Sequence, residues 1–239
     1  MSEPEKKPVG SLGRVVEAGL SGEAVSARGV LAAIGGVRGV IETLLPATVY
    51  LGFFVFTRDA RLSAIAPLVL AGFAIVWRLS RKEPLSAAVS GALGVVICAA
   101  AVMFSGEGSS YFVPGFFINA AWILAHTISL LIGWPLIGLL LGFLRGSLTE
   151  WRRVRELRHA AQLTTVIWIV VFAARLAVQL PLYFAAPPIG DSESATDALG
   201  LARLLMGVPL FALAVLFTWL VLSRVSSTVD AAEKSSSDE

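Results

Sequence analysis

The stretch FVPGFFINAAWILAHTISLLIG, residues 112–133, decides the fold of this chain. It carries no Lys, Arg, Asp or Glu, and about 20 apolar residues are what a helix needs to cross the hydrocarbon of a bilayer. Lipid offers no hydrogen-bond partners to the backbone, so only helices and closed barrels can cross it. Because the run is continuous rather than alternating, it predicts a transmembrane helix and not a barrel strand.

The whole chain shares this character. Of its 239 residues, 56% are hydrophobic and 15% are charged, and the mean hydropathy is +0.78. A soluble domain needs far fewer apolar residues to form one core. The long apolar runs predict an all-α polytopic membrane bundle with six transmembrane helices: 39–57, 62–77, 85–104, 112–133, 161–184 and 198–223. The apolar piece 134–146 is too short to span, and we predict a short re-entrant or inner-interface helix there.

The basic residues give the bundle an orientation. Six crossings place fifteen of the nineteen Lys and Arg on one side, against only Arg58 and Arg61 on the other, while Arg175 and Arg203 fall inside spans. Cytoplasmic loops carry such an excess of positive charge, so both termini are predicted to be cytoplasmic. A seventh span at 134–146 would move the arginines of residues 145–158 outside and weaken the asymmetry.

Three regions follow from this layout. Residues 1–34 are predicted to be a cytoplasmic segment that is partly disordered or interfacial, 35–224 the six-helix domain, and 225–239 a disordered cytoplasmic tail. The first residues lack the apolar core and cleavage site of a signal peptide, so the first span is expected to stay in the mature multi-pass protein. The basic run 148–157 is either drawn to anionic lipid or a solvated loop.

Charged and polar groups inside spans are costly and require a partner or a purpose. By helical rise, Asn119, Arg175, Gln179 and Arg203 fall in the outer half of the bundle and are expected to meet there. One hypothesis is an outer vestibule in which the two arginines attract an anionic ligand or lipid head group. The other is a structural network of hydrogen bonds. Three acids of the preceding loop are expected to reach Arg203 more readily than Arg175: Asp191, Glu193 and Asp197.

A second pair lies near the inner end of the first span. Arg38 and Glu42 are four residues apart and therefore share one helix face. We expect an interfacial ion pair that anchors the first helix, with a proton- or ion-coupled role for Glu42 as the alternative. Direct pairing of Glu42 with Arg175 is not expected, because their predicted depths differ.

The remaining histidine and cysteine residues do not suggest a metal, haem or catalytic site. His126 is isolated in the fourth span, His159 lies at the inner interface, and Cys98 is the single cysteine, which makes a poor set for metal or haem. No phosphate-binding loop, HExxH or GxSxG motif occurs. We therefore predict no catalytic residues, no cofactor, no metal and no enzyme.

Small residues repeat every four positions in two places, Ser86 to Cys98 and Gly138 to Gly146. Such stripes let helix backbones approach in lipid. We expect them to serve packing within the bundle, with a homodimer interface as the alternative.

Five segments taken together resemble an uncharacterised family of multi-pass membrane proteins from actinobacteria: GGVRGVIETLLP (35–46), FVPGFFINAAW (112–122), GWPLIGLLLGFLRG (133–146), FAARLAVQLPLY (172–183) and ALGLARLLMGVPLFAL (198–213). The likeness runs from about residue 30 to residue 224. It implies an inner-membrane protein and transfers no activity. The layout is also distantly similar to the intracellular septation protein A family, small membrane proteins linked to envelope and division machinery.

Two functions remain open at this point. The first is a non-enzymatic protein that supports cell-envelope or membrane assembly through partners or lipids. The second is a small transporter or channel with Glu42, Arg175 and Arg203 along its pathway, since three-plus-three spans permit an inverted repeat. The expected partners are the bilayer, including anionic lipids, and membrane proteins or a second copy, but not nucleic acid.

Overall fold

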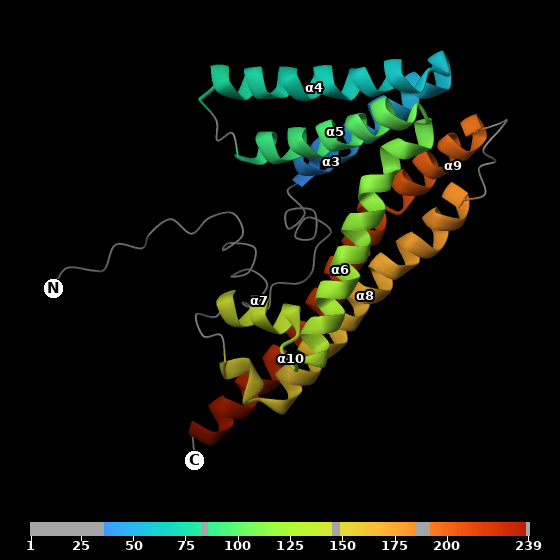
Figure 1. Ribbon diagram of the computed structural model, residues 1–239. Coiled ribbons are helices and arrows are strands. Elements are labelled where there is room, and N and C mark those ends of the chain that lie inside the picture. The colour runs from blue at the N-terminus through green and yellow to red at the C-terminus, as the bar shows by residue number, and fades with distance from the viewer. Residues whose placement is uncertain (1–35, 83–85, 145–148, 185–191, 238–239) are drawn as a thin grey trace. The chain divides into compact units, whose positions relative to one another are not determined.

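The structure, a computed structural model, describes residues 36–82, 86–144, 149–184 and 192–237, and its regular elements there are helices (Figure 1). The predicted all-α fold is confirmed over this part of the chain. The predicted N-terminal segment 1–34 lies outside the described residues.

The chain forms two compact units. The larger consists of Arg38–Leu124 and Val170–Phe211, and the smaller of Met1–Val37, Ala125–Ile169 and Ala212–Glu239.

Within the described ranges, five helical stretches are long and apolar enough to cross a membrane: Ala60–Ser80, Ala88–Ser105, Gly108–Leu131, Arg155–Phe184 and Glu193–Val225. The described apolar part of the first predicted span, Ile41–Thr57, is shorter than these. A multi-pass helical membrane protein is therefore what the chain encodes. Five of the six predicted spans meet the length criterion.

In the larger unit, helix α3 (Gly36–Thr57) is joined to α4 (Ala60–Ser80) by two residues. Arg58 adopts the left-handed conformation at φ 53°, which reverses the chain. Asp59 then caps α4, because its side chain accepts a hydrogen bond of 3.0 Å from the amide of Leu62. Helix α4 packs along α5 (Ser86–Ser105) (Figure 1). With 21 residues, α4 is longer than the predicted 62–77 and needs no special adjustment to span.

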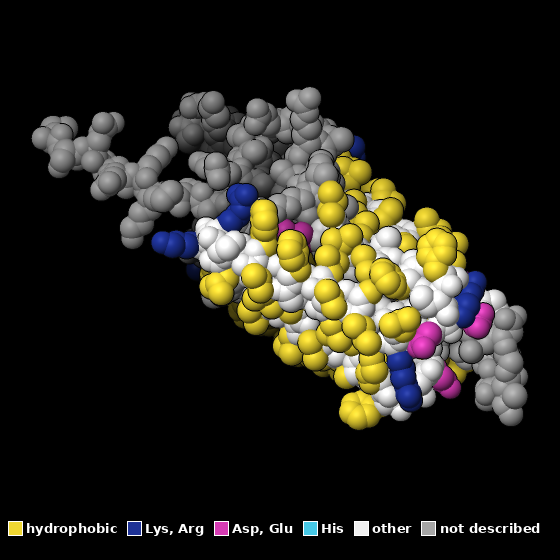
Figure 2. All heavy atoms as spheres, turned by 90° about the horizontal axis from the view of Figure 1, so that it is seen from above, with side chains coloured by type: hydrophobic (Ala, Val, Ile, Leu, Met, Phe, Trp, Pro, Cys, Tyr) yellow, Lys and Arg dark blue, Asp and Glu magenta, His cyan; other side chains and the backbone are white. Residues whose placement is uncertain are grey.

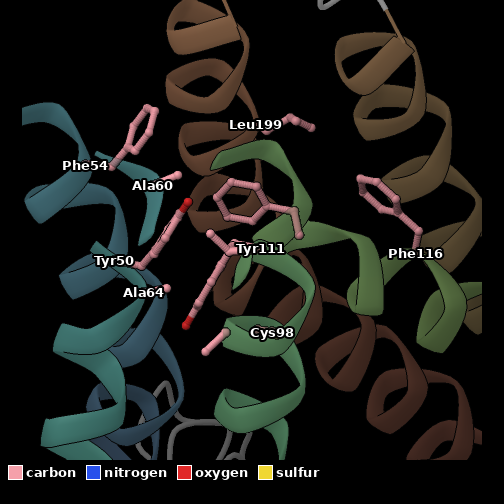
Figure 3. Packing of buried hydrophobic residues seen from close by; sticks show 11 residues of the cluster. Tyr50, Phe54, Ala60, Ala64, Cys98, Tyr111, Phe116 and Leu199 are labelled. Atoms are coloured by element: carbon pink, nitrogen blue, oxygen red, sulfur yellow. The ribbon is translucent and has the colours of Figure 1, made fainter. Parts of the chain in front are cut away.

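An aromatic core holds this unit together. The 3-10 helix η1 (Gly108–Phe112) contacts α4, α5 and α9 (Ser192–Leu205), and it leads into α6 (Val113–Leu131). The rings of Tyr50 and Tyr111 stack at 3.8 Å between centroids, at the centre of the buried cluster (Figure 3). Tyr50 also donates a hydrogen bond of 2.8 Å to the carbonyl of Gly108. The core therefore fixes η1 and, with it, the start of α6.

The smaller unit is built around a short helix, α7 (Leu136–Leu144), of nine residues. The hydroxyl of Ser129 accepts a hydrogen bond from the amide of Leu136, and that of Thr165 accepts one from the amide of Ile137. These bonds satisfy donors that a helix start leaves free. The piece 134–146 is thus a short helix, as predicted, and too short to cross a bilayer.

Trp151 is the centre of the second core. It is the middle residue of the 3-10 helix η2 (Glu150–Arg152), packs with Leu141 and Leu157, and is 2% exposed. Its ring lies against Gly138, where an added Cβ would be 2.7 to 2.9 Å from three ring carbons. The packing role predicted for the glycine stripe of α7 is confirmed at Gly138. The corresponding stripe on α5 differs, because an added Cβ at Gly94 would meet nothing within 4 Å.

The last two spans depart from their predicted bounds. Helix α8 (Arg155–Phe184) begins six residues before the predicted 161–184, so part of the basic run is helical. The predicted span 198–223 is broken at Met206 and Gly207 into α9 and α10 (Val208–Ser237). Pro209 follows the break and has no amide to continue a helix across it. Helix α10 continues from the last span into the region of the predicted tail, as far as Ser237.

The surface agrees with a lipid environment. Only 17% of the most apolar window of α4 is buried, and large apolar side chains such as Val69 and Phe73 are exposed. Figure 2 shows hydrophobic side chains over the middle of the visible face and charged side chains toward its two ends. A protein in water would leave few contiguous apolar patches of this kind.

Candidate functional site

Arg203, on α9 in the larger unit, reaches the start of α6. Its Nη1 donates a hydrogen bond of 3.3 Å to the carbonyl of Phe112, and its guanidinium lies 5.7 Å from the centre of the Phe112 ring. The side chain fits there because Gly115 has no Cβ. An added Cβ would collide with Nη1 and lie 3.1 Å from Cζ. The absence of a side chain at Gly115 therefore leaves room for this guanidinium beside α6.

Arg175 and Gln179 lie one turn apart on the same face of α8. Leu176 and Leu180, which are neighbours of these two residues on α8, pack against the same buried cluster as Phe112. Gln179 is 1% exposed, and its Nε2 is buried without a hydrogen-bond partner in the structure. The Nε of Arg175 is also buried and unpartnered. Two cationic groups and an amide donor thus belong to one region of the larger unit.

This region is rich in donors and short of acceptors. A buried donor without a partner costs about 1–3 kcal/mol, and more when it is charged. Within the described ranges, neither Arg175 nor Arg203 forms an ion pair. An arrangement of like charges with unsatisfied donors is unfavourable by itself, and an anion placed between the groups would relieve both costs.

The described acids that were predicted to reach Arg203 form ion pairs with a different arginine. Asp197 and Glu193 pair with Arg58, at 2.8 and 3.5 Å, on a solvent-accessible part of the surface. The prediction that they reach Arg203 is wrong, because the left-handed turn after α3 brings Arg58 to the start of α9 instead. Asp191 lies outside the described residues.

Glu42 forms an ion pair with a residue of another helix, and its predicted pair with Arg38 stays a prediction. Glu42 accepts a hydrogen bond of 2.7 Å from Arg78 at the end of α4. The Arg78 side chain is 13% exposed and that of Glu42 is 46% exposed. The side chain of Arg38 lies outside the described residues, although its backbone is part of α3. The pair therefore joins two helices rather than two turns of one helix.

The other predicted residues stand apart from the arginine pair. Asn119 is buried on α6, one turn after Gly115. His126 is also buried, but it belongs to the smaller unit, where its carbonyl accepts a hydrogen bond from Ser129. In the part of the chain that is described, no group of three His, Cys, Asp or Glu side chains converges as metal ligands would.

Sequence reasoning missed two contributors to the site. Gly115 and Phe112 look like ordinary residues of a span, and their role depends on a contact with α9 some ninety residues later in the chain. Only Gly115 left a signal, as a glycine in the first turn of a helix directly after a proline.

These features define a multi-pass helical membrane protein with two partly buried arginines in its larger unit. Residues 34–229 match the family described as "Protein of unknown function (DUF3159)", and the chain belongs to this family. No curated protein and no solved structure matches the chain.

Proposed function

We propose that this protein is a non-enzymatic membrane protein that supports cell-envelope or membrane assembly by binding an anionic group of a lipid or partner. The observation that carries the proposal is the cationic pair Arg175 and Arg203, which lacks a carboxylate partner among the described residues. Ionisable residues in a span mark functional sites more often than packing sites, because their insertion is costly.

The proposed topology has six crossings of the plasma membrane with both termini in the cytosol. The excess of Lys and Arg on one side supports it, as does the position of Arg58 in the short turn between α3 and α4 on the other. In this arrangement α7 is a re-entrant or inner-interface helix. The resemblance to actinobacterial proteins and to septation protein A suggests a role close to the cell envelope.

This topology places Arg203 near the outer surface and Arg175 deeper, nine residues before the end of α8 at Phe184. Arg203 donates to the carbonyl of Phe112, the residue directly before α6, so its guanidinium lies at the level of a helix end and not of the bilayer centre. A head group or soluble anion can reach this depth without crossing the hydrocarbon.

The test uses the full chain, purified and reconstituted in lipid nanodiscs. We expect anionic lipid, compared with zwitterionic lipid, to raise the temperature of unfolding of the wild type, because a ligand that binds only the folded state stabilises it. Arg175→Gln should abolish this rise. Arg58→Gln is the matched control, because Arg58 already has acidic partners at the surface. An equal rise in all three proteins would refute the proposal.

A small transporter or channel is the second candidate. The break at Met206 and Gly207, three residues after Arg203, is the observation that favours it, since interrupted spans form binding sites in many transporters. Proteoliposomes that accumulate an anion, and lose this activity in Arg175→Gln and Glu42→Gln, would establish transport. Uptake equal to that of empty liposomes would exclude it for the anions tested.

A further inference from the structure

We propose that the smaller unit has a membrane-surface site of its own, in which arginines of η2 and α8 bind the head groups of anionic phospholipids and α7 lies in the bilayer surface. Arg175 and Arg203 are no part of this site, because they belong to the larger unit. The inference goes beyond the proposed function and does not depend on it. It follows from the packing of η2 on α7, the exposed arginines and the length of α8.

Helix α7 and η2 pack against each other. The ring of Trp151 lies over Gly138 in the middle of α7, and the ring centroids of Trp134 and Trp151 are 6.4 Å apart. The guanidinium of Arg152 lies 4.1 Å from the centre of the Trp134 ring, a contact that the electron-rich face of the indole stabilises. These contacts hold η2 along α7, so the arginines that follow η2 begin beside this helix.

Three arginines of this segment remain available for a ligand. Arg153, Arg155 and Arg158 are exposed, and among the described residues none of them forms an ion pair. Arg155 and Arg158 are three residues apart and therefore share a face of α8. Leu157 and Ala161 of the same turns are buried in the core around η2. The helix thus buries its apolar side chains and leaves its cationic ones accessible.

The length of α8 places these arginines at the level of lipid head groups. At about 1.5 Å per residue, its 30 residues extend ~45 Å. The hydrocarbon of a bilayer is about 30 Å thick, and about 40–45 Å with the head groups. Apart from Arg175, the charged residues of α8 are confined to its first four positions, Arg155 to Arg158. Because charged residues avoid the hydrocarbon, this end of α8 lies among the head groups.

The exposed side chains of α7 favour a membrane over a soluble acidic partner. Leu140 is 50% exposed and Phe143 is 74% exposed, and their spacing of three residues places them on one helix face. With nine residues, α7 is too short to cross the bilayer, but an apolar face beside arginines is typical of a helix that lies in its surface. A soluble acidic partner would neutralise the arginines and leave both apolar side chains in water.

An anionic bilayer surface supplies the negative charge that this segment lacks. Each arginine near such a surface strengthens the association roughly fivefold. Arg153, Arg155 and Arg158 lie within six residues of one another, so they keep this attraction when tertiary contacts are lost. Lipid bound here therefore adds little to the rise in unfolding temperature, which reports on ligands of the folded state alone.

The experiment measures which lipid gathers at this segment. The full chain carries a fluorophore on Thr149→Cys, in a Cys98→Ala background, and is reconstituted in zwitterionic nanodiscs. Thr149 is exposed, and its carbonyl accepts a hydrogen bond from the amide of Arg152. The discs contain phosphatidylglycerol or phosphatidylcholine with a quenching spin label close to the head group. We expect phosphatidylglycerol to be preferred roughly tenfold at low salt.

Charge variants test the assignment of this preference. Arg155→Gln should lower it roughly fivefold, and the triple variant Arg153→Gln, Arg155→Gln, Arg158→Gln should abolish it. Glu156→Gln is the matched control, because it places the same residue in the same turn of α8 but removes a negative charge. It should strengthen the preference. In the wild type, about 1 M salt should remove most of the preference, since the Debye length falls to about 3 Å.

The outcomes separate this inference from the proposed function. Equal quenching by both lipids in the wild type would show that the arginines are solvated and would overturn the inference. Absence of quenching by either lipid would place the segment in water, open to a soluble acidic partner, and would overturn it as well. A preference that survives in the triple variant or at high salt does the same. Arg175→Gln should leave the preference unchanged, and its loss there would assign the lipid to the larger unit.

Discussion

Substitution of Gly115 by alanine tests the geometry of the arginine site directly. The new Cβ would lie 3.1 Å from Cζ and 3.2 Å from Nη2 of Arg203, and would collide with Nη1. Carbon atoms make unstrained contacts at about 3.5–4.0 Å, so the guanidinium must move by roughly 1 Å. Its hydrogen bond to the carbonyl of Phe112 is already 3.3 Å long and would be lost.

The expected magnitude follows from two opposing terms. A hydrogen bond of a charged group contributes about 1.5–3 kcal/mol. Alanine returns up to ~1 kcal/mol relative to glycine in a helix interior. The net loss in the free energy of unfolding is therefore about 0.5–2 kcal/mol, small enough for the protein to remain folded. Because the guanidinium of Arg203 moves away from α6, anion binding should weaken roughly tenfold.

The assay compares Gly115→Ala with Gly94→Ala in nanodiscs, with and without anionic lipid. Gly94 is the matched control, because a Cβ at this position on α5 would meet no heavy atom within 4 Å. Gly94→Ala should keep the stabilisation by lipid and Gly115→Ala should lose most of it. The same lipid response in both variants would show that Arg203 does not bind the anion from its position on α6.

Three further predictions concern the two cores and the topology. Tyr50→Phe removes the hydrogen bond to the carbonyl of Gly108 and should lower the free energy of unfolding by about 1–2 kcal/mol, measured by thermal unfolding; no change would show that the carbonyl has another partner. Gly138→Ala pushes into the buried ring of Trp151 and should cost about 1–3 kcal/mol, with a changed tryptophan emission as the local readout. Arg153→Cys should react with a membrane-impermeant thiol reagent only from the cytosolic side, and labelling of intact cells would reverse the proposed orientation.

Much of the fold was predictable because lipid imposes a simple rule on the backbone. A continuous apolar run such as 112–133 has no alternative to a helix, and α6 occupies most of it. The length argument also excluded a span at 134–146, where α7 has nine residues. Helix ends were less predictable. The start of α8 at Arg155 and the break before Val208 depend on local packing and on a proline rather than on hydropathy.

The site was only partly predictable. Depth along the spans placed Arg175 and Arg203 in the same half of the bundle, and the structure places both in the larger unit. Partners could not be inferred in this way. Glu42 pairs with Arg78 on another helix, and Asp197 pairs with Arg58. A salt bridge between separate helices depends on their rotation and on the turns that join them.

The sequence by itself determined that this chain is a multi-pass helical membrane protein and which ionisable groups enter its spans. These properties depend on the free energy of moving each residue from water to lipid, which is set residue by residue. Three features were decided by the tertiary structure alone. Gly115 leaves room for the guanidinium of Arg203, and Asp197 forms an ion pair with Arg58. The Nε2 atom of Gln179 is buried without a hydrogen-bond partner. Those contacts join residues far apart in the chain, and they exist only once the helices have packed.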